Sequence, residues 1–241
     1  MPTIAMWGKG KSSKLLAKAL NIKRNMRADW VIRYKRLDGF FAHEINTKEA
    51  IQKASNKYQS LCIMDDVGLT VPPFDKNLEH LDYERQIIFG RSFYHSKGSD
   101  ITVYYPLAIF PLLCNSTGVH HHDYYIQYLK SECEYRYHVA FGRVILATKK
   151  VLANGEVDDT LIRNHQDGKW QQIVCKERPS FSLACITAVQ AHGLDFGAVD
   201  FLKVNDKPVI LEVNTAPGLQ VENRLDVYVQ AFQSHFHSRR G

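Results

Sequence analysis

Three side chains near the C-terminus have the types and the spacing of a metal site. Asp200 lies in the apolar run "GAVDFLKV", and Glu212 and Asn214 lie two residues apart in the next run, "PVILEVN". Residues two apart on a strand point to the same face of a sheet, and a turn at "NDKP" brings Asp200 opposite that face. Hard divalent cations prefer carboxylate and amide oxygens, so the sequence predicts a site for Mg²⁺ or Mn²⁺.

The two strands that carry these groups need an apolar face on their other side. Val199, Phe201, Leu211 and Val213 alternate with the predicted ligands and are expected to fill the core. The second strand then runs into a Pro-Gly loop, "TAPGL". One hairpin can thus hold ligands on one face and be anchored by the other.

The rest of the chain supplies both helices and strands. Helices are predicted over 47–68, 181–194 and 226–236, with Gly68 and Gly193 as stops of the first two. Strands are predicted where apolar and aromatic residues run between turn signals. These are residues 30–34, 85–93, 100–110, 124–129, 135–142 and 143–151.

The N-terminal segment "IAMWGKGKSS" offers a competing phosphate site. Ala5, Gly10, Lys11 and Ser12 fit a relaxed Walker A pattern, in which backbone amides and a lysine hold phosphates. The acidic strand that completes such a site would be "SLCIMDDVG", residues 60–68. A P-loop kinase that uses Lys11 is therefore one hypothesis for this chain.

The segment that holds Asp65 and Asp66 fits a helix better than a strand. Apolar residues recur there every three to four positions, so both aspartates are predicted to be surface carboxylates. The N-terminal glycines then form a turn before a helix that Ser12 or Ser13 caps. The amides of that turn and Lys11 would still attract an anionic substrate.

The stretch "GAVDFLKVNDKPVILEVNTAPGL" resembles the metal-binding end of the ATP-grasp superfamily. In that superfamily an Asp on one strand and a Glu-x-Asn on the next precede a Pro-Gly loop, and these side chains hold Mg²⁺ ions that bridge ATP phosphates. The resemblance implies an α+β fold in which two lobes enclose ATP. The implied parts are a small N-terminal α/β lobe (1–55), the small ATP-grasp subdomain with a phosphate-covering loop (56–128) and the C-terminal subdomain with the metal site (129–241).

Segments upstream extend the resemblance to the phosphate-binding parts of the fold. "NKYQSLCIMDDVGLTVPPF" resembles the family's first core helix, where Lys57 would reach a nucleotide phosphate. "IIFGRSFYHSKGSDITVYY" resembles the strand, loop and strand that fold over the triphosphate, with Arg91 where most members carry a lysine. Arginine also binds phosphate, in a bidentate manner. The loop contributes Lys97 and Gly98 and holds fewer glycines than the family's loops.

"YYIQYLKSECEYRYHVAFG" resembles the hinge between the lobes and the strand after it. Arg136, in Glu-Tyr-Arg, would neutralise the transferring phosphoryl group, or it would simply pair with a carboxylate. Lys149, at the end of the next strand, would also face the site. The hinge residues whose backbone groups would face adenine are Gln127, Tyr128 and Leu129.

The resemblance implies an enzyme, an ATP-dependent carboxylate–amine ligase. A substrate carboxylate would attack the γ-phosphate of ATP, and an amine or related nucleophile would displace phosphate from the acyl phosphate, with ADP and phosphate released. Arg91 and Arg136 are the expected catalytic residues, and ATP and Mg²⁺ (or Mn²⁺) the expected cofactors. Besides the P-loop kinase, an ATP-grasp kinase and a nucleotide-binding module without ligase turnover remain alternatives.

The composition and the net charge limit the classes of possible binding partner but do not select one of them. The chain of 241 residues has a formal net charge of +6, which suits an acidic peptide, a nucleotide derivative or nucleic acid. No apolar run reaches the roughly 18 residues that span a bilayer. The five cysteines lack paired spacing, so a cytoplasmic protein without disulfides or a zinc site is expected. Because the compact chain also resembles ATP-grasp proteins of bacteriophages and bacteria, a phage origin would place it in a host cytoplasm.

Overall fold

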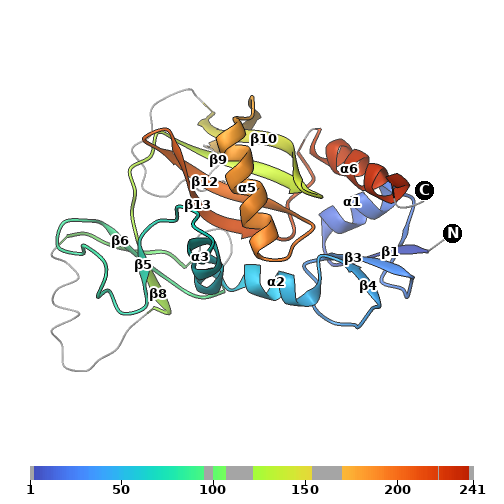
Figure 1. The fold of residues 1–241 in the computed structure, drawn as a ribbon, viewed down its shortest axis with the longest axis horizontal. Helices are drawn as coiled ribbons and strands as arrows, with labels where there is room; N and C mark the ends of the chain where they lie inside the picture. Colours follow the sequence, from blue (N-terminus) through green and yellow to red (C-terminus); the bar gives the residue numbers. More distant parts are fainter. Residues whose placement is uncertain (1–2, 95–99, 107–121, 154–169, 222, 239–241) are drawn as a thin grey trace.

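The computed structural model describes residues 3–94, 100–106, 122–153, 170–221 and 223–238. Within these residues the strands form three sheets, which lie side by side along the longest axis of the molecule (Figure 1). The N-terminal sheet lies at one end, the C-terminal sheet in the middle, and the sheet between them in sequence at the other end. This mixture of helices and sheets confirms the predicted α+β class.

The N-terminal sheet is parallel, with the strand order β2-β1-β3-β4. After β1 the chain turns at Gly10, whose φ of 95° is a conformation that glycine adopts at low cost, and α1 (Lys11–Ala19) begins. Gly10 is itself the N-cap, so the predicted capping by Ser12 or Ser13 is wrong, because both serines already lie inside the helix. The strands are β1 (Ile4–Gly8), β2 (Lys23–Arg24), β3 (Trp30–Tyr34) and β4 (His43–Ile45).

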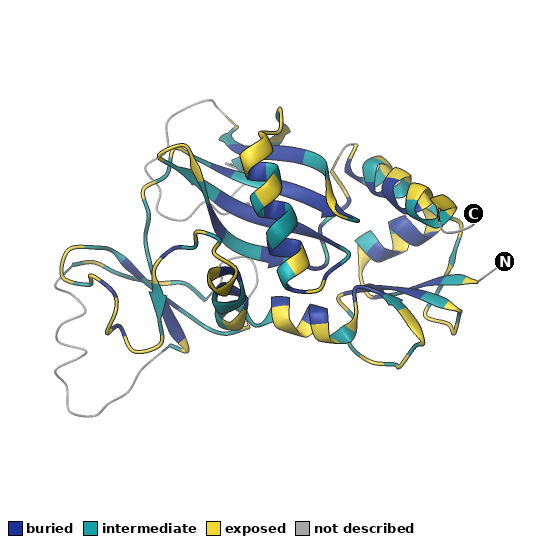
Figure 2. Ribbon diagram, viewed as in Figure 1, coloured by how far each residue is buried: buried dark blue, intermediate teal, exposed yellow. Residues whose placement is uncertain are grey.

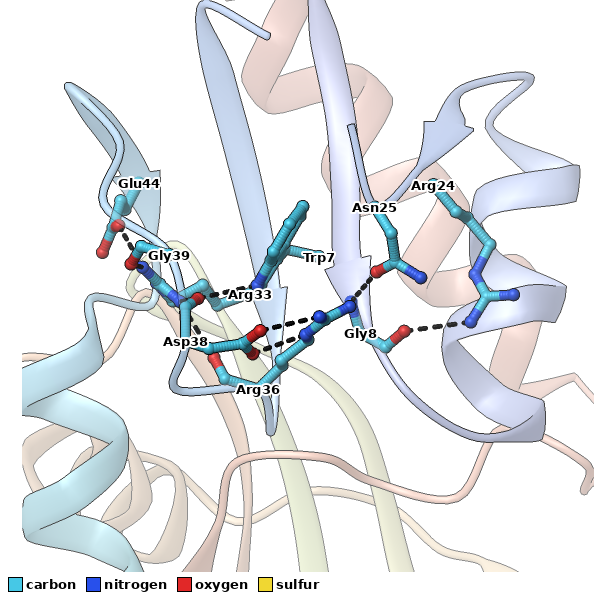
Figure 3. A network of polar contacts seen from close by, with 9 residues as sticks. All are labelled: Trp7, Gly8, Arg24, Asn25, Arg33, Arg36, Asp38, Gly39 and Glu44. Atoms are coloured by element: carbon cyan, nitrogen blue, oxygen red, sulfur yellow. Dashed lines mark hydrogen bonds and ion pairs between the residues drawn. The ribbon is translucent and has the colours of Figure 1, made fainter. Parts of the chain in front are cut away.

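A buried arginine fixes the loop that follows β3. The Arg33 side chain is 1% exposed and pairs with Glu44 at 2.5 Å. It also donates hydrogen bonds to three backbone carbonyls of the loop, those of Arg36, Asp38 and Gly39 (Figure 3). Since a buried guanidinium needs both a counter-charge and hydrogen-bond acceptors, Arg33 has the environment of a structural residue.

The prediction of one helix over 47–68 is wrong, because the chain forms α2 (Lys48–Ser55) and α3 (Lys57–Asp66) there. The break is at Asn56, whose backbone is extended, with φ −79° and ψ 107°. Its side-chain oxygen accepts a hydrogen bond from the Gln59 amide at 3.0 Å. An asparagine in this conformation competes with a continuous helix and caps a new one.

The middle sheet is antiparallel, with the order β5-β8-β6-β7. Three of its strands lie inside the predicted strands 85–93, 100–110 and 124–129 and are shorter than predicted. The fourth, β5, was not predicted. The strands are β5 (Phe74–Asp75), β6 (Ile88–Arg91), β7 (Thr102–Tyr104) and β8 (Tyr124–Gln127).

The C-terminal sheet is antiparallel, with the order β11-β10-β9-β12-β13. Two-residue turns at 141–142 and 205–206, with positive φ at both positions, join its two hairpins. The second turn is the one predicted at "NDKP", whereas β11, like β2 and β4, was not predicted. The strands are β9 (Cys133–Ala140), β10 (Arg143–Leu152), β11 (Trp170–Val174), β12 (Phe196–Val204) and β13 (Lys207–Asn214).

Different helices pack on the two faces of the C-terminal sheet. Helix α5 (Pro179–Ala191) lies across one face, where the apolar side chains of the strands form the main core (Figure 1). Buried residues run along these strands, while the outer turns of α5 are exposed (Figure 2). The other face is covered at one end by α6 (Arg224–Ser238), whose Tyr228 and Phe232 pack with Phe196 of β12. Further along β12 the same face carries the polar side chains of the candidate site.

Asn46 ties the N-terminal lobe to the C-terminal sheet. It is fully buried, its Oδ1 accepts from the amides of Asp195 (2.8 Å) and Phe196 (3.1 Å), and its φ is 59°. Asn46→Ala is expected to destabilise the fold by about 2–4 kcal/mol, because two buried amides lose their acceptor. Asn21→Ala is the matched control, since Asn21 is exposed at φ 53° and reports only the backbone penalty of about 1 kcal/mol. Urea unfolding measures the free energy of unfolding of both variants. An equal loss of stability in the two variants would contradict the role of Asn46 as a tie between the lobe and the sheet.

Candidate active site

The three side chains predicted as ligands lie together at the end of the β12–β13 hairpin. Asp200 and Glu212 face each other in the strand register. The amide nitrogen of Asn214 donates to Asp200 Oδ2 at 3.0 Å and to Glu212 Oε1 at 2.8 Å. Two carboxylates and a carboxamide therefore converge within hydrogen-bonding distance.

A β-bulge holds the two carboxylates opposite each other. The register shifts between Asp200 and Phe201, so that Phe201 pairs with Ile210 and Leu211 is the extra residue. Ile210 is fully buried and takes the core position, whereas Leu211 is only half-buried. The prediction that Leu211 fills the core is therefore wrong, because the extra residue changes the alternation at this point.

Arg136 binds both oxygens of Asp200. Its Nε donates to Oδ1 and its Nη2 to Oδ2, both at 2.5 Å, from the neighbouring strand β9. Asp200 is 5% exposed. Burial lowers the pKa of Arg136, but the charge of Asp200 outweighs burial and the pKa is raised. Such bidentate charge-assisted pairs are the strong ones.

Lys57 completes the cluster from the first turn of α3. Its Nζ lies 3.0 Å from Glu212 Oε2. Burial raises the pKa of Glu212, but Lys57, the Asn214 amide and Arg136 together hold that pKa well below its usual range. Glu212 is therefore ionised at neutral pH. The cluster balances two negative and two positive side chains.

This donor set fits a divalent cation. Asp200 and Glu212 supply two ionised carboxylates, and a half-turn of the Asn214 amide would present its oxygen beside them. A cation bound there would replace Arg136 and Lys57 as the counter-charges. Both cationic side chains would then be available to a neighbouring anion such as a triphosphate.

Arg91, on β6, forms an ion pair with a carboxylate on the far side of the predicted phosphate-covering loop. Its Nη2 is 3.6 Å from Asp100 Oδ1, across the start of the predicted phosphate-covering loop. Burial raises the pKa of Tyr124. The charge of Arg91 lowers this pKa and the charge of Glu212 raises it, so both charges act on the same phenol. Lys97 and Gly98 of that loop lie outside the described residues.

Lys149 was predicted to face the ATP site, but the strand register places it on the opposite face of the sheet from Arg136. Thr148 pairs with Arg136 and Lys149 with Tyr135, so Lys149 lies on the face that α5 covers. On the Arg136 face its neighbour Lys150 forms an ion pair with Glu134 instead. Sequence reasoning missed this pair, although two-residue alternation from Arg136 points to Glu134.

The three hinge residues are half-buried where β8 ends. The Gln127 amide donates to the Pro73 carbonyl and the Tyr128 amide to the Ile87 carbonyl, both at 2.8 Å. These bonds hold the segment in place before the chain crosses, past Leu129, to the C-terminal sheet. Adenine binding at this hinge stays a prediction.

Among the described strands, none gives the N-terminal glycine turn the acidic neighbour that a P-loop needs. Asp65 and Asp66 are exposed on α3, as predicted, and not on a strand. Among the described strands, those beside β1 are β2 and β3, and neither carries a carboxylate. The turn instead contacts the Pro-Gly loop, because Ser12 Oγ accepts from the Leu219 amide at 3.0 Å. Lys11 is exposed beside it.

Solved structures share this architecture over nearly their whole length. The chain is similar to a D-alanine–D-alanine ligase from Bacillus anthracis (13% identical, TM-score 0.64, 100% of both chains). It is also similar to the ATP-grasp ligase PsnB, solved with a minimal precursor, Mg and ADP (13% identical, TM-score 0.69, 96% of both chains). A third neighbour is a RimK-domain ATP-grasp protein from Sphaerobacter thermophilus (10% identical, TM-score 0.65, 97% of this chain and 98% of that one). The chain has the ATP-grasp fold. This confirms the resemblance found in the sequence.

The sequence relatives of this chain are named as probable ligases. It is 31% identical over 96 residues to a probable alpha-L-glutamate ligase of Methanococcoides burtonii, which is 39% of this chain and 30% of that protein. It is 38% identical over 78 residues to one of Chromohalobacter salexigens, 32% of this chain and 24% of that protein. The chain thus spans less than a third of the length of these relatives. No protein-family model matches it.

Among the described residues, no helix combines the length and the apolar character that crossing a bilayer requires.

Proposed function

We propose that this chain is an ATP-dependent ligase that joins a carboxylate to an amine through an acyl phosphate. The observation that carries the proposal is the cluster of Asp200, Glu212 and Asn214 with Arg136 and Lys57, set in an ATP-grasp fold. The ligase relatives support the same class of reaction.

The residues of the cluster have separate tasks in this mechanism. Asp200, Glu212 and Asn214 would hold Mg²⁺, which when bound would offset the negative charge of the ATP phosphates. Lys57 and Arg91 hold the phosphates in line with the attacking carboxylate. Arg136, released from Asp200, stabilises the charge on the transferring phosphoryl group.

The names of the sequence relatives and of a structural neighbour suggest the first substrates to test. L-Glutamate is the first amine, because the sequence relatives are named as glutamate ligases. Peptide carboxylates are the first acids, because a neighbouring ATP-grasp ligase was solved with its precursor peptide. The net charge of +6 favours acidic partners of both kinds.

Trapping with hydroxylamine tests the proposal. With ATP, Mg²⁺ and a peptide acid, the protein is expected to release ADP and to form a hydroxamate, because hydroxylamine intercepts an acyl phosphate. The same mixture without the acid is the control and should release little ADP. A stable phospho-ester would identify an ATP-grasp kinase, and ATP binding without ADP release would identify a nucleotide-binding module; either result would refute the ligase.

A further inference from the structure

The positive charge of this chain is concentrated in the N-terminal lobe, residues 1–55. The lobe holds 12 of the 31 Lys and Arg residues and 4 of the 25 Asp and Glu residues, so its formal net charge is +8. Residues 56–241 hold the remaining 19 and 21 and have a net charge of −2. The excess of positive charge therefore lies in a lobe that supplies none of the side chains of the candidate active-site cluster.

The acidic residues of the lobe do not neutralise its first part. Asp38 and Glu44 pair with Arg36 and Arg33 around the loop that follows β3 (Figure 3). Asp29 is the first acidic residue of the chain, so residues 1–28 contain seven Lys and Arg residues and no acidic side chain. The first turn, helix and strand of the lobe thus form a segment with charge of one sign.

Three of these cations form a lysine stripe along α1, made of Lys11, Lys14 and Lys18. They are three and four residues apart, a spacing that places side chains on the same side of a helix. All three are exposed, whereas Leu16 and Ala17 are buried in the core that α1 shares with α6. Since a helix rises 1.5 Å per residue, the stripe is about 10 Å long.

Two further exposed lysines flank the stripe. Lys9 lies in the turn before α1, and Lys23 lies on β2. Arg24 of β2 donates to the Gly8 carbonyl at 3.0 Å (Figure 3) and to Ser13 Oγ at 3.3 Å, so β2 is held against the start of α1. In the part of the chain that the structure describes, neither these two lysines nor those of the stripe form an ion pair.

The chemistry of this surface suits phosphates better than a protein partner. Its five exposed cations are lysines, which act as point charges, whereas arginine supplies the bidentate fork that matches a carboxylate. Protein partners bind mainly through apolar and aromatic anchors in pockets. Within the described residues 8–25, no large apolar side chain is exposed. A nucleic acid needs no such anchor, because charge supplies most of the affinity for its backbone.

We propose that the lysine stripe binds the phosphate backbone of a nucleic acid without reading its sequence. A duplex carries one negative charge per about 1.7 Å of its axis, so about six phosphate charges lie along a stripe of this length. Lysines placed beside them release condensed counter-ions, and this release drives binding. Such binding needs neither ATP nor the metal site, so the nucleic acid is a partner additional to the substrates of the proposed ligase.

Fluorescence anisotropy with a DNA duplex of about 20 base pairs, which is longer than the stripe, measures this binding. In about 0.1 M salt the stripe variant is expected to bind at least about tenfold more weakly than the wild type. The control variant removes three exposed lysines outside the lobe and should lose less than about threefold, because salt screens distant charges. The stripe variant is Lys11→Gln, Lys14→Gln and Lys18→Gln, and the control is Lys130→Gln, Lys176→Gln and Lys207→Gln.

Equal losses in these two variants would show that only the overall charge attracts the duplex, and would overturn the proposal. Arginine at the three positions of the stripe keeps the charge and should keep the affinity. A loss in that variant as large as in the stripe variant would also overturn the proposal. The Tm of all three variants should stay within about 2 °C of the wild type, since the lysines are exposed and unpaired.

The salt dependence of the affinity reports how many phosphates are neutralised. The slope of log affinity against log salt should be less steep by about 2–3 in the stripe variant, and an unchanged slope would contradict the proposal. Poly-L-glutamate of the same total charge tests the other class of polyanion. It should displace the duplex only at a concentration at least about tenfold higher. Displacement at equal concentration would assign the stripe to an acidic polypeptide instead.

The outcomes for the duplex and for the ligase are distinguishable, because the anisotropy measurement contains no ATP. Duplex binding that depends on the stripe, in a protein that forms no hydroxamate, would refute only the ligase. Hydroxamate formation by a protein that does not bind the duplex would refute only the nucleic-acid site.

Discussion

Replacing Glu212 by glutamine is expected to lower ATP turnover by at least about a hundredfold while the fold is kept. Glutamine retains an oxygen for the Asn214 amide, which now donates to Glu212 at 2.8 Å. It removes one of the two carboxylates of the cluster, and a divalent cation depends on that negative charge. Lys57, 3.0 Å away, also loses its counter-charge.

Steady-state ADP release at several Mg²⁺ concentrations measures this effect. The half-saturating Mg²⁺ concentration should rise in Glu212→Gln, and thermal shift with MgATP should show weaker stabilisation. Lys11→Ala is the matched control, because Lys11 is exposed on α1 and should affect ATP turnover by less than about threefold. If Lys11→Ala abolishes ATP binding and Glu212→Gln does not impair turnover, the P-loop hypothesis replaces the ATP-grasp site.

Arg136→Met is expected to destabilise the protein by about 3–5 kcal/mol as well as to impair turnover. The substitution leaves the Asp200 carboxylate, 5% exposed, with the Asn214 amide as its hydrogen-bond donor and without its bidentate counter-charge. Removing both charges, in Arg136→Met with Asp200→Asn, should restore most of the stability, since no unpaired ion stays buried.

Urea unfolding with and without Mg²⁺ separates the structural effect from the metal site. Millimolar Mg²⁺ should restore part of the stability of Arg136→Met, because the cation supplies the counter-charge that Asp200 has lost. It should not restore the double variant, which lacks that carboxylate. Equal Mg²⁺ effects on the two variants would show that Asp200 does not bind the metal.

Part of this structure could be predicted from the sequence, because the spacing of side chains along a strand or a helix is fixed over a few residues. The types of the three predicted ligands, and the shared face of Glu212 and Asn214, could be predicted because strands alternate with period two. The turn alone would have set Asp200 opposite Leu211, and the bulge at Leu211 is what sets it opposite Glu212. Exposure of Asp65 and Asp66 followed from helical spacing in the same way. The ATP-grasp resemblance rested on this local pattern, and the fold confirms it.

The tertiary structure decided which residues complete the site. Arg136 meets Asp200 across 64 residues of chain, so this contact leaves no short-range pattern in the sequence. The bulge at Leu211 and the face of Lys149 depend on the register with neighbouring strands, where one extra or shifted residue reverses which side chains face inward. The sequence alone determined the chemistry of the hairpin. Packing of α6, β9 and the Pro-Gly loop decided which charges surround it, because burial and counter-charges are set by neighbours distant in the chain.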